Sequence, residues 1–148
     1  MARVAINGLG RIGRAALKII IETPELELVA VNDLVPPDNL AYLLKYDSVY
    51  GRYEKNVEAR EKSLVIDGKE YEVLTVKDPA QLPWKGKEID IVLECTGMFT
   101  KKEDMEKHLE AGAKHVILSA PAKGDGVPFV VHGVNHIEDD VKMISCAS

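Results

Sequence analysis

Residues 4–13 read Val4-Ala5-Ile6-Asn7-Gly8-Leu9-Gly10-Arg11-Ile12-Gly13, and this stretch decides the fold. The apolar run before Asn7 is typical of a β-strand, and the residues after Gly13 predict a helix, so the glycines form the turn between the two. In such a turn Gly8 allows the sharp bend, Gly10 lets the backbone approach a pyrophosphate, and Gly13 lets the helix pack close to the strand. The spacing therefore indicates a phosphate-binding turn.

A second strand and an acidic residue follow at the distance that this turn requires. The apolar run 26–31 ends at Asn32-Asp33, and Asp33 stands about 20 residues beyond Gly13. At the tip of the second strand its carboxylate can accept both hydroxyls of an adenosine ribose, while the diphosphate lies on the unpaired N–H groups at the helix start. The pattern predicts dinucleotide binding; the alternative is a pair of ordinary turns between strand and helix.

Length, composition and charge limit the classes of protein to which the chain can belong. At 148 residues, with 46% hydrophobic and 29% charged residues, the chain is expected to form one globular domain. A formal net charge of −5 argues against a nucleic-acid partner. No apolar run is long enough for a membrane span, and no signal segment precedes the first strand, so we expect a cytoplasmic protein without a membrane partner. Cys95 and Cys146 suit a reducing compartment and need no disulfide.

Periodicity predicts a helix at each of three places. The first covers about 11–22, the second covers 39–46 with Asp38 as its cap, and the third opens at a capping box running from Thr100 to Glu103. In the third, Met105, Leu109 and Ala113 fall on one face.

Strands are predicted between and beyond these helices, and the polar segment 52–61 is interpreted as a solvated loop. Residues 63–74 indicate an antiparallel hairpin that turns at Asp67-Gly68. Alternation of strand and helix predicts an α/β fold, a Rossmann-type doubly wound and mostly parallel sheet with the hairpin inserted. Besides the hairpin, the expected strands are 4–6, 26–31, 89–95, 115–119, 127–132 and 143–146.

Five motifs together resemble one family over the whole chain. They are Ala5-Ile6-Asn7-Gly8-Leu9-Gly10-Arg11-Ile12-Gly13-Arg14, Val31-Asn32-Asp33, Leu43-Leu44-Lys45-Tyr46-Asp47-Ser48, Glu94-Cys95-Thr96-Gly97 and Ser119-Ala120-Pro121-Ala122-Lys123. In these residues, and in their order, the chain is similar to phosphorylating glyceraldehyde-3-phosphate dehydrogenase.

The resemblance implies where the catalytic nucleophile belongs. The family carries Ala-Ser-Cys-Thr-Thr-Asn, and the present sequence ends in Ala147-Ser148, so the nucleophilic cysteine is expected immediately after Ser148. Ser148 would then contact the substrate. Cys146 lies three positions too early and is interpreted as a small buried thiol. No catalytic residue and no metal site are expected within the chain, and His108, His115, His132 and His136 are assigned to surface or packing.

The same resemblance implies an architecture. Residues 1–148 would form the NAD-binding domain, the N-terminal part of a longer two-domain enzyme whose substrate domain and C-terminal helix lie outside this sequence. The parent would oxidise and phosphorylate glyceraldehyde 3-phosphate with NAD through a cysteine thioester, as a homo-oligomer that is a tetramer in the family. The chain alone would bind NAD without catalysis. The alternatives are a free-standing nucleotide-binding or interaction module, or the same domain of erythrose-4-phosphate dehydrogenase.

The resemblance also implies which individual residues contact the cofactor. The resemblance assigns them to the start of the first helix, to the ribose acid, to a lysine near the adenine, and to two later strand ends. Asn7 could hold the glycine turn through bonds from its side chain to the backbone. Asp33 favours NAD over NADP because a carboxylate repels a 2′-phosphate. The predicted cofactor-binding residues are Asn7, Gly8, Gly10, Arg11, Ile12, Gly13, Asp33, Lys77, Thr96, Gly97 and Ser119.

Overall fold

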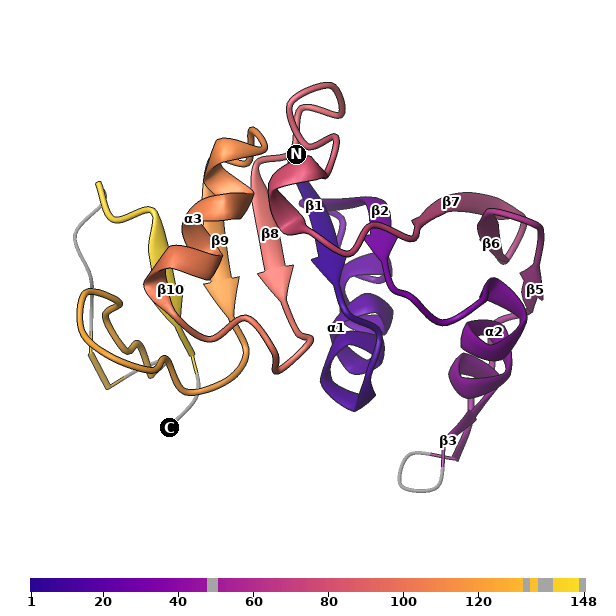
Figure 1. The fold of residues 1–148 in the computed structure, drawn as a ribbon. Helices are drawn as coiled ribbons and strands as arrows, with labels where there is room; N and C mark the ends of the chain where they lie inside the picture. Colours follow the sequence, from indigo (N-terminus) through magenta and orange to yellow (C-terminus); the bar gives the residue numbers. More distant parts are fainter. Residues whose placement is uncertain (48–50, 132–133, 136–139, 147–148) are drawn as a thin grey trace.

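The computed structural model describes residues 1–47, 51–131, 134–135 and 140–146. Its main feature is a twisted sheet in the order β10-β9-β8-β1-β2-β7-β6-β5, with β3 and β4 paired separately (Figure 1). The strands are β1 (Ala2–Asn7), β2 (Leu26–Asn32), β3 (Tyr46–Asp47), β4 (Gly51–Arg52), β5 (Val57–Ala59), β6 (Ser63–Ile66), β7 (Lys69–Leu74), β8 (Ile91–Glu94), β9 (His115–Leu118) and β10 (Met143–Ser145).

Pairing is parallel from β10 across to β7 and antiparallel from β7 to β5, which confirms the predicted α/β class. The chain begins in the middle of the sheet at β1, builds outward through β2 and β7, and then returns to β8 on the other side of β1. Strand order therefore reverses between β1 and β8. In a doubly wound sheet, this switch point is where ligands bind.

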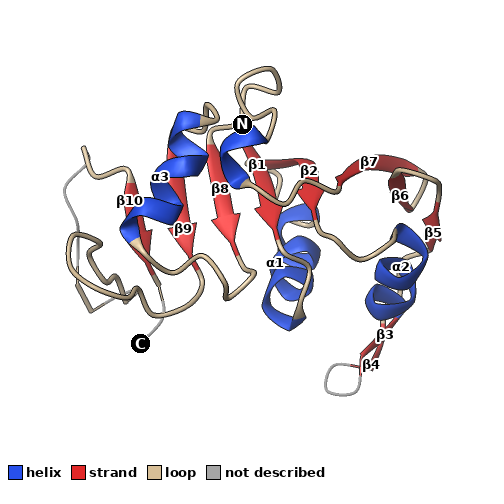
Figure 2. Ribbon diagram, in the orientation of Figure 1, coloured by secondary structure: helices blue, strands red, loops and turns tan. Residues whose placement is uncertain are grey.

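Helices cover both faces of the sheet (Figure 2). The helix α1 (Arg11–Ile21) buries Leu17 and Ile20 against β1 and β2. On the opposite face, α3 (Lys102–Glu110) packs against the 3-10 helix η1 (Pro79–Gln81), and the fully buried Trp84 bonds to His108 of α3. The remaining helix, α2 (Pro37–Lys45), packs over the outer strands. Among the residues that the structure describes, no helix is long and apolar enough to cross a membrane.

The hairpin prediction is confirmed, including its turn. Asp67 and Gly68 both have positive φ, 48° and 84°, which suits a two-residue turn that matches the strand twist. The hairpin is nevertheless part of the main sheet, because β7 pairs in parallel with β2.

Helix boundaries correct two predicted caps. The second helix begins at Pro37, so Asp38 lies inside its first turn and Pro36 is the N-cap. The third helix has Lys101 as its N-cap, and Thr100 is almost fully buried instead of capping the helix. Pro37 explains the first shift, since proline is well tolerated at the first helical position.

Two predicted segments also differ from the structure. The polar segment 52–61 is not a simple loop: it contains β5, whose Val57 is fully buried. Conversely, 127–131 is not a regular strand. Phe129 forms a single parallel bridge to Ser145, and His132 lies outside the described residues.

Candidate functional site

A cleft of about 360 Å³ opens at the switch point, where β1, β2 and β8 end. Its walls combine polar strand ends with the apolar side chains of Leu34, Val76 and Phe99. More than half of the predicted cofactor residues line it: Asn7, Gly8, Gly10, Asp33, Lys77 and Thr96.

Glycine is suited to each of the three positions in the turn for a different structural reason. Gly8 has a φ of 96°, and a Cβ there would lie 2.8 Å from the backbone nitrogen of Thr96. A Cβ on Gly13 would lie 2.0 Å from the carbonyl oxygen of Gly8, so only glycine lets α1 approach the turn this closely. Around Gly10, in contrast, a Cβ would meet nothing within 4 Å. Because Gly10 lines the cleft, that open space is available to a ligand.

Asp33 connects the second strand to the glycine turn. Its Oδ2 accepts the N–H of Leu9 at 2.7 Å, and its Oδ1 accepts the N–H of Val35 at 2.9 Å. An ionised carboxylate offers about four acceptor positions, so about two remain for hydroxyl donors in the cleft. The acid therefore stabilises the turn and still has capacity for a ribose.

The start of α1 offers backbone donors beside the cleft. Gly10 is its N-cap, and none of the side chains that the structure describes caps this end. The N–H groups of Arg11 and Ile12 belong to the first turn, which has no intrahelical partners, and the helix dipole favours an anion there. No acidic residue occupies that turn. Open space, backbone donors and a ribose acceptor together fit a dinucleotide diphosphate.

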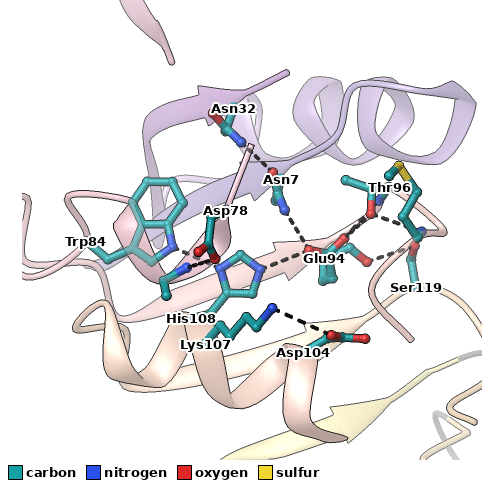
Figure 3. A network of polar contacts seen from close by, with 12 residues as sticks. Asn7, Asn32, Asp78, Trp84, Glu94, Thr96, Asp104, Lys107, His108 and Ser119 are labelled. Carbon is teal, nitrogen blue, oxygen red and sulfur yellow. Dashed lines mark hydrogen bonds and ion pairs between the residues drawn. The ribbon is translucent and has the colours of Figure 1, made fainter. Parts of the chain in front are cut away.

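A row of polar side chains, which the sequence did not predict, crosses the strand ends beside the cleft (Figure 3). The strand register places Asn32, Asn7 and Glu94 side by side. Asn32 Nδ2 donates to Asn7 Oδ1 at 2.8 Å, and Asn7 Nδ2 donates to Glu94 Oε1 at 2.6 Å. We call these three residues the polar row. Asn7 thus bonds to its neighbours in the sheet, and the expected bonds from its side chain to the glycine turn are not formed.

The polar row continues into the protein interior. His108 Nε2 lies 2.9 Å from Glu94 Oε1, and Trp84 Nε1 donates to His108 Nδ1 at 3.0 Å. Glu94, His108 and Trp84 are all fully buried. His108, expected at the surface or in packing, is packed in the interior, and both of its ring nitrogens also have polar partners. The available signal was the acid Glu94 within an otherwise apolar strand.

Ser119 and Cys95 lie beside this row. The Ser119 hydroxyl donates to the carbonyl oxygen of Glu94 at 3.2 Å, joining β9 to β8. Burial raises the pKa of the Cys95 thiol, the charge of Glu94 acts in the same direction, and the hydrogen bond with Ser119 opposes them. Cys95 lines the cleft, and its raised pKa disfavours the thiolate form that acts as a nucleophile.

The remaining predicted residues lie at the margin of the cleft or outside the described residues. Gly97 directly follows Thr96 with a φ of 73°, and Ser148 is not among the described residues. Cys146, predicted to be buried, is exposed, because it lies one residue beyond the end of β10. Within the described ranges, no group of three or more histidine, cysteine or acidic residues could hold a metal ion.

A second hollow, of about 450 Å³, lies far from the switch point. It is lined by charged and aromatic residues between Lys45 and Val57, next to positions that are not described. Chemistry favours the smaller cleft, because only there do the glycine turn, the helix start and Asp33 meet.

Comparison with known proteins agrees with this geometry. Residues 2–102 match the family described as glyceraldehyde 3-phosphate dehydrogenase, NAD binding domain. Proteins named glyceraldehyde-3-phosphate dehydrogenase from Mycoplasma pneumoniae and Thermotoga maritima are each 52% identical to the chain, over 99% and 100% of its length. One from Clostridium acetobutylicum is also 52% identical, over 95%.

The chain spans less than half of these relatives, 44%, 45% and 42% of their respective lengths. The family match covers the glycine turn, Asp33, the hairpin and β8. The chain therefore belongs to the NAD-binding domain family of glyceraldehyde 3-phosphate dehydrogenase, and its cofactor is NAD.

Proposed function

We propose that the cleft at the switch point is the NAD site. In this arrangement Asp33 accepts the adenosine ribose hydroxyls, the first turn of α1 binds the diphosphate, and Thr96 and Gly97 border the part beyond it. One observation carries the proposal: the Asp33 carboxylate lines the cleft while bonded to the N–H of Leu9 in the glycine turn. Ribose acceptor and phosphate turn are thereby held at a fixed separation.

The remaining predicted contacts take secondary roles in this proposal. Lys77 lines the cleft as an exposed cation on the adenosine side. Ser119 acts through the backbone of Glu94. Asp33 disfavours NADP, because its carboxylate would face a 2′-phosphate.

We further propose that residues 1–148 form the cofactor-binding part of a phosphorylating glyceraldehyde-3-phosphate dehydrogenase. Bound NAD would supply the hydride acceptor for oxidation of the aldehyde, and phosphate would complete the reaction. The names of the relatives support this proposal. The hydrogen bonds of the chain support it as well: the Cys95 thiol is paired with Ser119, and the His108 ring is bonded to Glu94 and Trp84, so these two groups do not form a cysteine–histidine pair. The nucleophile and Ser148's substrate contact then belong to the longer protein, and the chain alone binds NAD without turnover.

The proposal also covers the cellular compartment, the partners and the oligomeric state of the protein. Two free cysteines suit a reducing compartment, in keeping with the cytoplasm, and the net charge of −5 disfavours nucleic acid. Homo-oligomer formation has support from Ile12 and Ile19, which are 60% and 65% exposed on α1. Erythrose-4-phosphate dehydrogenase remains the second candidate on the resemblance of its N-terminal motifs.

A pair of glycine variants tests the site. Gly10→Ala should unfold at the same denaturant concentration as the wild-type chain, yet bind NAD at least tenfold more weakly in calorimetry, because the new methyl group enters the open space of the cleft. Gly13→Ala should lose stability, because its Cβ overlaps the Gly8 carbonyl. Unchanged NAD affinity in Gly10→Ala, or no NAD binding by the wild-type chain, would refute the proposed site.

Enzyme assays separate the functional proposals. The chain mixed with glyceraldehyde 3-phosphate, phosphate and NAD should produce no NADH above a blank without protein. Turnover by the chain alone would contradict the division of labour proposed here.

A further inference from the structure

Four hydrogen bonds converge on the two oxygens of Glu94, which is fully buried. Oε1 lies 2.6 Å from Asn7 Nδ2 and 2.9 Å from His108 Nε2. Oε2 lies 3.0 Å from the Thr96 backbone nitrogen and 2.7 Å from the Thr96 hydroxyl. All of the acceptor positions of a carboxylate are thus occupied.

The direction of each bond on the His108 side is fixed by an indole. Trp84 Nε1–H can only donate, so His108 Nδ1 must accept and carries no proton. The neutral ring therefore holds its proton on Nε2 and donates it to Glu94. Since Nδ1 is unprotonated, His108 is not a cation.

Backbone groups fix the direction on the other side. The N–H of Val76 donates to Asn32 Oδ1, and the carbonyl oxygen of Val76 accepts from Asn32 Nδ2. This orients the amide of Asn32 and, through their bond, that of Asn7, so Asn7 presents its NH₂ to Glu94. At Thr96 the backbone N–H donates to Glu94 Oε2, and the hydroxyl, whose oxygen accepts the N–H of Met98, forms the fourth bond to the same carboxyl oxygen.

Three of the four bonds thus bring a hydrogen to the carboxyl group of Glu94, from Asn7, from His108 and from the backbone of Thr96. The fourth joins it to the Thr96 hydroxyl. A fully buried polar group of this kind is satisfied only while these partners stay in place. The segments that provide them include two walls of the cleft, Asn7 at the end of β1 and Thr96 after β8.

We propose that Glu94 is a positioning residue for the cofactor: it holds the Thr96 turn against the end of β1 and so shapes the β8 wall for the part of NAD beyond the diphosphate. This inference rests on the proposed function. It assigns no contact between Glu94 and NAD. The Asp33 carboxylate is held by the N–H groups of Leu9 and Val35, neither of which contacts Glu94.

Whether NAD affinity rises or falls in Glu94→Gln distinguishes a positioning role of Glu94 from a purely electrostatic one. Replacing Glu94 with glutamine cannot add negative charge near a diphosphate site, so by Coulomb's law the change in charge alone would leave anion binding unchanged or strengthen it. Positioning predicts the opposite, because a glutamine NH₂ would face either Thr96 or the Asn7 and His108 donors. A fall in NAD affinity in Glu94→Gln therefore reports loss of geometry.

The experiment measures binding of NAD and of AMP to the full chain by calorimetry. Glu94→Gln should bind NAD at least tenfold more weakly and AMP within threefold of wild type, because AMP depends on the Asp33 side. A second readout needs no cofactor: alkylation of Cys95 by iodoacetamide, resolved from Cys146 by peptide mass spectrometry, should become faster as the Thr96 turn loosens.

Two His108 variants keep the test decisive if Glu94→Gln does not fold. His108→Gln can still donate to Glu94 and accept from Trp84, so it should retain NAD affinity within threefold. His108→Leu removes the donor outside the cleft and should weaken NAD selectively over AMP. Leu64→Ala, in the core under the hairpin and outside this hydrogen-bonded network, should lower the unfolding midpoint without changing the ratio of NAD to AMP affinity, which controls for simple loss of stability.

The outcomes are distinct. Unchanged NAD affinity in Glu94→Gln, or in His108→Leu where Glu94→Gln is unfolded, overturns the inference. An equal fall in the affinities for NAD and for AMP would also overturn the inference. If wild-type chain binds no NAD, the proposed function fails instead.

Discussion

Two acidic side chains lie at the ends of the strands on either side of β1, Asp33 after β2 and Glu94 at the end of β8, and they differ in burial. Each accepts a backbone N–H from the turn that follows it, Val35 for Asp33 and Thr96 for Glu94. Asp33 lies partly exposed in the cleft with acceptor capacity to spare. Glu94 is 0% exposed, and the protein itself fills its acceptor positions.

The difference shows how burial decides the role of one chemical group. A half-exposed carboxylate can exchange water for a ligand hydroxyl at little cost, so it serves recognition. A buried carboxylate cannot exchange partners without leaving donors unsatisfied. It therefore serves to hold backbone segments in place, and three predictions test this contrast.

The largest effect is expected for the stability of Glu94→Gln. Replacing this buried carboxyl group leaves at least one donor facing an amide NH₂, and the expected loss is about 3 kcal/mol in the free energy of unfolding. Denaturant titration followed by circular dichroism measures it. Glu110→Gln, on the exposed side of α3, is the matched control and should stay within about 0.5 kcal/mol. Equal stability of both variants would remove the contrast between the two acids.

Asp33→Asn should show the reverse balance, a modest loss of stability and a clear change in binding. One backbone donor loses its charged acceptor, which costs about 1 kcal/mol. NAD affinity should fall about tenfold, equivalent to about 1.4 kcal/mol. NADP should lose less, because the repulsion of its 2′-phosphate is removed. Calorimetry with both dinucleotides checks the ratio, and an unchanged preference would contradict the ribose role.

Asp90, before β8 at the opposite end of the sheet, provides the smallest effect. The backbone N–H of Arg3 and the ammonium of Lys114 hold the pKa of Asp90 below its usual value. A carboxyl group with a lowered folded-state pKa stabilises the protein above the unfolded value, about 4, and this contribution is lost as pH falls through the folded value. Asp90→Asn should therefore match wild type in acid and be slightly less stable near neutral pH. Solvent screening keeps the difference small. Thermal unfolding measured from pH 2 to pH 7 tests the sign.

Local sequence patterns predicted the central part of the molecule well. The glycine turn, Asp33 and the Asp67-Gly68 hairpin each need a particular backbone conformation or spacing that few residues provide, so their signals are strong. The family resemblance assigned Lys77 and Thr96 to the cofactor, and both line the cleft. Their contacts with NAD stay predictions.

The polar row could not be found in this way, because its bonds join residues that are far apart in sequence. Asn7 and Glu94 meet only after β1 pairs with β8, and His108 reaches them from α3. The strand β5 was missed for a related reason: its Val57 becomes buried only under α2. The local periodicity of a sequence does not predict contacts between residues that are far apart along the chain.

Trp84 gives this molecule a natural optical probe. The sequence contains a single tryptophan, and its indole sits at the inner end of the hydrogen-bonded chain that starts at the cleft. Intrinsic fluorescence therefore arises from one buried site rather than from an average over several. The unfolding of wild type and variants can be followed by emission from this indole, without a label attached near the cofactor site.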